Sequence, residues 1–124
     1  MESKPKLVLI VEGDPIQREL MAAAVRRMGG SVLKASDGVE GADLLVTEEP
    51  DAAVIDLFLP TRSGLDILRE ARRLGCLERT RVIVFSALGY PEVVKQAVEL
   101  GARDFLVKPV DPDLLVERLT GLLK

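Results

Sequence analysis

The chain of 124 residues contains no histidine and no tryptophan, and it contains only one cysteine. Without histidine it cannot form the Ser-His or Cys-His pairs of many nucleophilic enzymes, or a histidine-based metal site. The single cysteine, Cys76, excludes a disulfide bond within the chain and fits a reducing compartment, so we expect a cytoplasmic protein. No apolar run reaches the length of a membrane span and no signal-peptide pattern is present, so we expect no membrane partner.

An excess of positive charge is also missing from the chain. The formal net charge is -3, so nothing draws the surface as a whole toward nucleic acid, and we expect no nucleic-acid partner. The composition is 48% hydrophobic and 30% charged, which is ordinary for a folded globular protein and excludes a disordered chain. The length fits one domain that covers residues 1–124.

Five apolar runs of strand length alternate with segments of helical period. The runs are almost continuously hydrophobic, which is typical of strands buried on both faces of a parallel sheet. We therefore predict an α/β fold of the (βα)5 type, a flavodoxin-like doubly wound parallel sheet with strand order 2-1-3-4-5. The expected strands cover 7–11, 32–35, 52–55, 82–85 and 105–107, and the expected helices cover 15–28, 37–49, 65–75, 91–101 and 112–122.

The first expected helix has clear start and stop signals. Asp14 is placed to be its N-cap and Pro15 its first residue, while a pair of glycines follows its end. Apolar residues recur along it at a spacing of four, which predicts one apolar face. The residues of that face are Ile16, Leu20, Ala24 and Met28.

Polar residues follow directly after four of the apolar runs. They are Glu12, Asp56, Ser86 and Lys108. The carboxyl ends of parallel strands meet at one edge of the sheet, where open α/β sheets bind their ligands, so we expect these side chains in one pocket. A carboxylate, a hydroxyl and an ammonium group together suit a phosphoryl group, whose transfer needs positioning and charge neutralisation.

Five motifs carry a family resemblance, and their order and their positions at strand ends matter more than any one of them. They are Leu9-Ile10-Val11-Glu12, Val54-Ile55-Asp56-Leu57-Phe58-Leu59-Pro60 followed by Gly64, Val84-Phe85-Ser86-Ala87, Gly101-Ala102-Arg103-Asp104-Phe105, and Lys108-Pro109. With these motifs the chain resembles, over essentially its whole length, the receiver domains of bacterial two-component response regulators.

The resemblance implies a phosphoacceptor and a metal site. Asp56 matches the aspartate whose carboxylate attacks the phosphoryl group of a phosphohistidine on a partner protein. Glu12, Asp56 and the backbone carbonyl of Phe58 match the groups that hold a divalent cation. Mg²⁺ is the implied cofactor, because it prefers carboxylate, carbonyl and water oxygens.

The resemblance also implies a switch. Ser86 and Lys108 match the hydroxyl and the ammonium group that contact the phosphoryl oxygens, and Phe105 matches an aromatic residue whose rotamer changes with Ser86. The Lys108–Pro109 peptide bond matches a cis bond.

A signalling role in a two-component phosphorelay follows from the resemblance. The implied donor is a sensor histidine kinase or a phosphotransfer protein. The implied output is a change in the face made by the fourth helix, fifth strand and fifth helix, which binds a downstream protein or a second copy of the chain. Haloacid-dehalogenase-type phosphatases use similar groups, but they usually carry a second aspartate where this chain has Phe58. We therefore expect a phosphoacceptor signalling domain and not an enzyme.

Position 13 departs from the family pattern. Receivers usually carry two adjacent acidic residues after the first strand, and here Glu12 is followed by Gly13. Two unit charges about 4 Å apart interact by roughly 4 kcal/mol at an effective dielectric of 20, so losing one ligand carboxylate could weaken Mg²⁺ binding by about a hundredfold or more. Asp14 is a candidate further ligand, although it is also the expected helix cap.

Three alternatives stay open at this position. The remaining oxygen ligands suffice for Mg²⁺ and phosphorylation. Or the domain is a phosphorylation-independent pseudo-receiver that acts as a protein-binding module. Or Gly13 replaces a different residue of the natural protein.

Overall fold

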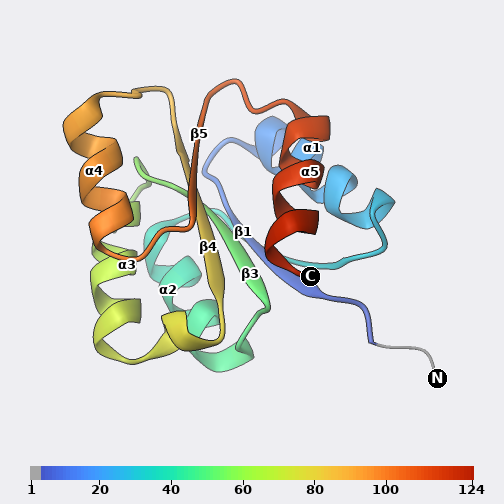
Figure 1. Ribbon diagram of the computed structural model, residues 1–124, viewed down its shortest axis with the longest axis horizontal. Helices are drawn as coiled ribbons and strands as arrows, with labels where there is room; N and C mark the ends of the chain where they lie inside the picture. Colours follow the sequence, from blue (N-terminus) through green and yellow to red (C-terminus); the bar gives the residue numbers. More distant parts are fainter. Residues whose placement is uncertain (1–3) are drawn as a thin grey trace.

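The computed structural model describes residues 4–124, which form one parallel sheet with helices on both faces (Figure 1). Strands and helices alternate along the chain as the sequence predicts. The elements are β1 (Leu7–Val11), α1 (Pro15–Arg27), β2 (Ser31–Ala35), α2 (Gly38–Glu48), β3 (Ala52–Asp56), α3 (Gly64–Arg73), the short 3₁₀ helix η1 (Cys76–Glu78), β4 (Arg81–Ser86), α4 (Pro91–Glu99), β5 (Asp104–Val107) and α5 (Pro112–Leu122).

The sheet has the order β2-β1-β3-β4-β5 with all neighbours parallel, which confirms the predicted flavodoxin-like topology. β1 and β3 are adjacent although β2 separates them in sequence, so the strand order reverses beside β1. The register pairs Val11 with Ile55, and Asp56 with Phe85. Residues that follow β1, β3 and β4 therefore reach the same edge of the sheet.

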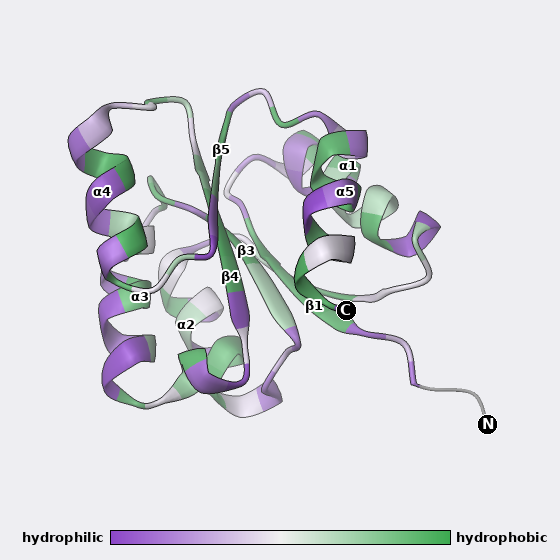
Figure 2. Cartoon of the chain, in the orientation of Figure 1, coloured by the Kyte–Doolittle hydropathy of each residue, from purple (hydrophilic) through white to green (hydrophobic). Residues whose placement is uncertain are grey.

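Two apolar cores lie on the two faces of the sheet. One core packs α1 and α5 against the sheet, and the other packs α2, α3 and α4 against the opposite face (Figure 1). The hydrophobic colouring of Figure 2 runs through the strands between these two helical layers. Side chains from neighbouring strand positions alternate between the cores, as Val8 and Leu9 do, which explains why the strand sequences are continuously apolar.

The predicted apolar face of α1 is wrong in part. Ile16 is 71% exposed and Leu20 is 50% exposed, whereas Met21 and Val25 are buried against the sheet. A spacing of four residues advances about 40° around a helix of 3.6 residues per turn, so a long series with this spacing drifts off the buried face. The sheet selects a face centred on residues 21 and 25 and leaves Ile16 and Leu20 exposed near the start of α1.

Side-chain caps fix where several helices begin. Asp14 accepts a hydrogen bond from the Ile16 amide at the start of α1, and Asp37 accepts one from the Glu40 amide at the start of α2. Ser63 and Asp111 cap α3 and α5 in the same way.

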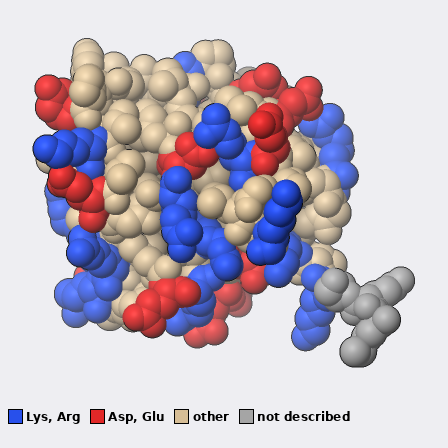
Figure 3. Space-filling view, viewed as in Figure 1, with Lys and Arg blue, Asp and Glu red and all other residues tan. Residues whose placement is uncertain are grey.

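The charges on one face of the molecule and the helix lengths complete the description of the fold. Positive and negative side chains are interspersed on the face seen in Figure 3. Within residues 4–124, no helix is both long enough and apolar enough to cross a membrane.

Candidate functional site

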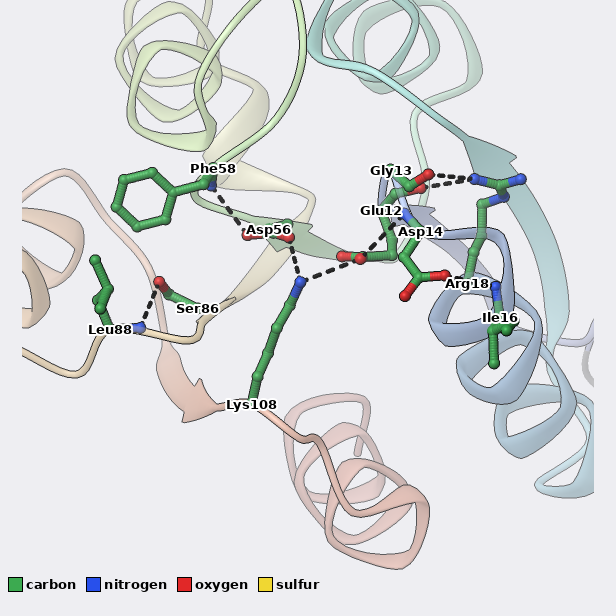
Figure 4. Close-up of polar contacts among 10 residues, drawn as sticks. All are labelled: Glu12, Gly13, Asp14, Ile16, Arg18, Asp56, Phe58, Ser86, Leu88 and Lys108. Carbon is green, nitrogen blue, oxygen red and sulfur yellow. Dashed lines mark hydrogen bonds and ion pairs between the residues drawn. The ribbon is translucent and has the colours of Figure 1, made fainter.

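The edge of the sheet at the carboxyl ends of β1, β3 and β5 brings three charged side chains into contact (Figure 4). Lys108 Nζ lies 2.6 Å from Asp56 Oδ2 and 3.1 Å from Glu12 Oε1. Residues 12, 56 and 108 are far apart in sequence, and the parallel topology alone places them together. The sequence predicted that these three side chains lie together at one edge of the sheet, and the structure brings Glu12, Asp56 and Lys108 together there.

Glu12 is the most deeply buried carboxylate of the site. The residue is 1% exposed, and its buried Oε2 atom has no hydrogen-bond partner among residues 4–124. Burial raises the pKa of Glu12 above its ordinary value, and the neighbouring Asp56 carboxyl group adds to the rise, while Lys108 opposes it. An unpaired, desolvated carboxylate oxygen is a costly arrangement unless a cation approaches it.

Lys108 is the cation of the site in this state. Burial disfavours its charged form, but the hydrogen bonds and charges of Asp56 and Glu12 outweigh burial, so the pKa of Lys108 is raised. Its Nζ atom also lies 5.3 Å from the centre of the buried Phe85 ring. The Lys108–Pro109 peptide bond is cis, as the family resemblance implies. These contacts hold the ammonium group between the two carboxylates.

Asp56 and the loop after it are held together locally. Asp56 is 4% exposed, and its Oδ1 atom accepts a hydrogen bond of 3.0 Å from the Phe58 amide. The Phe58 side chain is 58% exposed, so the residue contributes backbone groups to the site while its ring faces solvent. Gly64 closes the loop by donating to the Leu57 carbonyl at 2.9 Å.

The predicted switch residues are near the edge but are not bonded to Asp56. Ser86 is completely buried, and its hydroxyl accepts a hydrogen bond of 3.0 Å from the Leu88 amide, which closes the loop after β4 (Figure 4). Its backbone carbonyl accepts from the Lys108 amide at 2.8 Å, so the two residues are neighbours across β4 and β5. Phe105 is half-buried and packs against the core on the α4 side of the sheet.

Position 13 has room for a side chain. A Cβ atom built on Gly13 would lie 3.5 Å from the nearest atoms, on Pro60 and on the Ser36 carbonyl, which is ordinary contact distance. Packing around position 13 therefore does not require glycine. Asp14, the candidate substitute, is engaged as the α1 cap through its bond to the Ile16 amide.

The donor set fits a hard divalent cation, though only weakly. Glu12 and Asp56 supply two carboxylates, and the unpartnered Oε2 atom of Glu12 leaves acceptor capacity unused. Within residues 4–124, no group of three or more Asp, Glu, Cys or His side chains is arranged to hold a metal ion. The Phe58 carbonyl and water would have to complete the coordination of Mg²⁺, which commonly keeps several waters.

Two residues that sequence reasoning missed organise the loops of the site. Arg18 Nη1 donates to the Glu12 carbonyl at 2.8 Å and ties the loop after β1 to α1. Thr61, in the loop after β3, has a left-handed backbone with φ of 68°. An arginine at the end of the first turn of a helix that follows the acidic residue is a weak signal for the Arg18 contact. Nothing in the sequence indicates the left-handed conformation of Thr61.

Comparisons with known proteins agree on one family. The family model described as the response regulator receiver domain matches residues 8–120. The chain is 38% identical over 117 residues to the response regulator protein PmrA of Pseudomonas aeruginosa, covering 94% of this chain and 52% of that protein. It is 37% identical over 119 residues to a cyclic di-GMP phosphodiesterase of Thermotoga maritima, covering 94% of this chain and 31% of that protein. It thus spans about half or less of these relatives' length.

A solved structure gives the same result for the fold. The BeF3-activated DrrB receiver domain matches with a TM-score of 0.86 at 26% sequence identity, covering 97% of this chain and 98% of that one. The similarity extends over nearly the whole of both chains.

Proposed function

The chain belongs to the response regulator receiver domain family, and on that premise we propose that it accepts a phosphoryl group on Asp56 from a histidine kinase or a phosphotransfer protein. Residues 1–124 then act as one receiver domain, a phosphoacceptor signalling domain and not an enzyme. The single observation that carries the proposal is the buried contact of Asp56 with Lys108 at the carboxyl edge of the sheet.

The proposed transfer is a displacement at phosphorus. A carboxylate oxygen of Asp56 attacks the phosphorus of the donor phosphohistidine, an oxygen–phosphorus bond forms, and the phosphorus–nitrogen bond breaks. The bonding electrons leave with the imidazole nitrogen of the donor. Lys108 is placed to neutralise charge on the phosphoryl oxygens, a role in which a compact ammonium group is effective.

Mg²⁺ is the proposed cofactor, held by Glu12, Asp56 and the Phe58 carbonyl, and when bound it supplies further neutralisation of phosphoryl charge. Asp14 is not needed in this scheme, because its carboxylate caps α1. Ser86 has to exchange its bond with the Leu88 amide for one to the phosphoryl group. That exchange, together with a rotamer change of Phe105, couples the site to the loop after β4.

Exposed apolar side chains mark two surfaces for partners. Ile16 and Leu20 lie on the first turns of α1, directly after the loop that carries Glu12, which suits docking of the donor. Tyr90, Val98 and Val107 are 58%, 54% and 53% exposed on or beside α4 and β5, which suits docking of a downstream protein or a second copy. Neither surface calls for a nucleic-acid or membrane partner.

A second candidate function is a protein-binding module that works without phosphorylation. The observation that favours it is Gly13, together with the ammonium group of Lys108, which bridges both remaining carboxylates. In that state one ammonium group partly compensates the two carboxylates without a metal ion. The two candidates differ in one measurable property, which is uptake of a phosphoryl group.

The test is intact-mass analysis of the protein after treatment with acetyl phosphate and Mg²⁺. We expect the parent protein to gain the mass of one phosphoryl group and the Asp56→Asn variant to gain none. Asp51→Asn is the matched control, because Asp51 precedes the same strand at its other end and accepts a bond from the Leu7 amide. It should react like the parent.

Each result of this test has a defined meaning. Equal uptake by the parent and Asp56→Asn would show that the phosphoacceptor is another residue. No uptake by the parent would favour the phosphorylation-independent module. In that case binding of beryllofluoride with Mg²⁺, followed by NMR, decides whether the site takes a phosphoryl mimic at all.

A further inference from the structure

The loop between β3 and α3 contains a β-branched residue in an unfavourable conformation. Thr61 has a φ of 68°, in the left-handed region that threonine rarely adopts. Residues are held in such regions only where surrounding contacts over-determine them, and such positions cluster at functional sites. Thr61 lies five residues after Asp56, in the segment that also carries the Phe58 carbonyl.

The side chain of Thr61 is bonded to the start of α2. Its hydroxyl accepts a hydrogen bond of 3.1 Å from the Val39 amide and donates one of 3.2 Å to Asp37 Oδ1. The Asp37 carboxylate is at the same time the N-cap of α2, through the Glu40 amide at 2.9 Å. The Val39 amide lies in the first turn of α2, where amides have no acceptor within the helix. One hydroxyl therefore joins the loop after β3 both to this amide and to the residue that caps α2.

Backbone contacts make the same junction tight. The Gly38 amide donates to the Pro60 carbonyl at 3.0 Å, and a Cβ atom on Gly38 would lie only 2.0 Å from the Arg62 carbonyl oxygen. Pro60 is also the nearest neighbour of Gly13, at 3.5 Å from its Cβ position. The loop is thus seated between the start of α2 and the loop that follows Glu12.

The other end of the loop is anchored at the acceptor itself. The Gly64 amide donates to the Leu57 carbonyl, and a Cβ atom on Gly64 would lie 2.4 Å from the Asp56 carbonyl oxygen. Between this anchor and Thr61 lies Phe58, whose amide bonds to Asp56 Oδ1. The position of Phe58 is therefore set from two sides.

We propose that Thr61 is a positioning residue for the phosphoryl site: its hydroxyl fastens the β3–α3 loop to the start of α2 and thereby holds the Asp56 carboxylate and the Phe58 backbone in place. This inference deepens the proposed function and rests on it for its effect on phosphoryl uptake. Thr61 touches none of the reacting atoms. It acts through Pro60 and Phe58.

The experiment compares three variants with the parent. Thr61→Val keeps the β-branched shape and removes both hydroxyl bonds, and Thr61→Gly relieves the backbone conformation and also removes them. Thr61→Asn tolerates a left-handed backbone and keeps a side-chain oxygen, so it is the rescue variant. Thr47→Val is the matched control, because the Thr47 hydroxyl, near the far end of α2, donates to the Asp43 carbonyl of its own helix.

Two quantities are measured for each variant. The first is amide hydrogen exchange by NMR in the metal-free protein, for the amides of Gly38 and Phe58. The second is the initial rate of phosphoryl uptake from acetyl phosphate at several Mg²⁺ concentrations. We expect Thr61→Val and Thr61→Gly to exchange both amides about tenfold faster, and to take up phosphate about five- to tenfold more slowly. Thr61→Asn and Thr47→Val should stay within about threefold of the parent on both measurements.

The outcomes separate this proposal from the proposed function. If Thr61→Val or Thr61→Gly matches the parent in both measurements, the hydroxyl does not hold the loop and the proposal is overturned. A rise in exchange at Gly38 without any at Phe58 would also overturn it, because the contact would then be structural only. If the parent takes up no phosphate, the proposed function fails, and hydrogen exchange alone decides on Thr61.

Discussion

The two ends of the parallel sheet bury polar groups in different ways. At the carboxyl end, Glu12, Asp56 and Lys108 form a charged cluster in which one buried carboxylate oxygen has no hydrogen-bond partner in the described part of the chain. At the amino end, the buried Thr80 hydroxyl donates to the Pro50 carbonyl at 2.6 Å, and Asp51 accepts from the Leu7 amide at 2.8 Å. The polar groups named at the amino end are hydrogen-bonded. At the carboxyl end, by contrast, charged groups are buried and one carboxylate oxygen can still accept a hydrogen bond or bind a cation.

This difference separates groups that stabilise the fold from groups whose burial costs free energy. A buried ion cluster costs desolvation energy that its own attraction only partly offsets, so it is weak evidence for stability. A neutral buried hydrogen bond adds modestly to the free energy of unfolding, and a larger loss follows when one partner is removed and the other is left buried and unpaired. Substitutions at the two ends should therefore differ in whether they change stability alone or also change ligand binding.

The largest expected effect follows from removing the cation at the carboxyl end. Lys108→Met leaves Glu12 and Asp56 buried side by side without compensation, and we expect a loss of about 3 kcal/mol in the free energy of unfolding near neutral pH. Denaturation by urea measures it. Lys95→Met is the matched control, because Lys95 pairs with Glu99 at 3.9 Å on an exposed helix and should cost less than about 0.5 kcal/mol. Equal losses in both variants would mean that the two carboxylates carry no unpaired charge.

The second effect comes from adding a charge at the same end. Gly13→Asp has space for its Cβ atom, and we expect Mg²⁺ to bind about ten- to a hundredfold more tightly. Without metal, the third carboxylate should lower stability, so the variant should be less stable than the parent in EDTA and more stable in Mg²⁺. Calorimetric titration measures the affinity. Gly121→Asp, at an open position on α5, is the control and should leave Mg²⁺ binding unchanged.

At the amino end, Thr80→Val tests a neutral contact. The change keeps the shape of the side chain and leaves the buried Pro50 carbonyl without its donor, so we expect a loss of about 2 kcal/mol in stability. Mg²⁺ binding and phosphoryl uptake should equal those of the parent when measured well below the unfolding midpoint. A change in Mg²⁺ affinity would contradict the separation between the two ends of the sheet.

The sequence was sufficient to predict the carboxyl end in outline. Apolar runs that end in Glu12, Asp56 and Lys108, combined with a parallel sheet of known order, bring these residues together without any detail of packing. The strand order is the one usual for doubly wound sheets of this type. The alternation of strands and helices and the cap at Asp14 follow from periodicity and local chemistry. The alternation and the cap depend on interactions between residues that are close in sequence.

Other features depend on contacts between distant segments, and the sequence did not predict them. The exposed side of α1 at Ile16 and Leu20 is decided by how the helix sits on the sheet. The left-handed conformation of Thr61 is decided by the start of α2, which lies more than twenty residues away in the chain. The Ser86 hydroxyl is directed by the loop after β4, where it accepts a hydrogen bond from the Leu88 amide. Propensity and spacing contain none of this information.

The smallest expected effect concerns how stability depends on pH. The pKa of buried Glu12 is raised above 4.5, chiefly by desolvation, so its contribution to stability is present below pH 4.5 and is lost as pH rises through the raised value. The pKa of exposed Glu70 on α3 is lowered by its hydrogen bond with Arg73, so its contribution is present above pH 4.5 and is lost as pH falls. The two carboxylates therefore act with opposite signs.

Glu12→Gln and Glu70→Gln test this difference directly. Unfolding free energies are measured in urea from pH 4 to pH 7, and the difference between parent and variant is followed across that range. With Glu12→Gln, the parent should lose stability relative to the variant as pH rises above 4.5. With Glu70→Gln, the parent should gain slightly relative to the variant as pH rises from 4 through 4.5, and the difference should then stay nearly constant up to pH 7. Slopes of the same sign would mean that Lys108 compensates Glu12 fully, and the carboxyl end would then be no more poised for a ligand than the exposed ion pairs of α3.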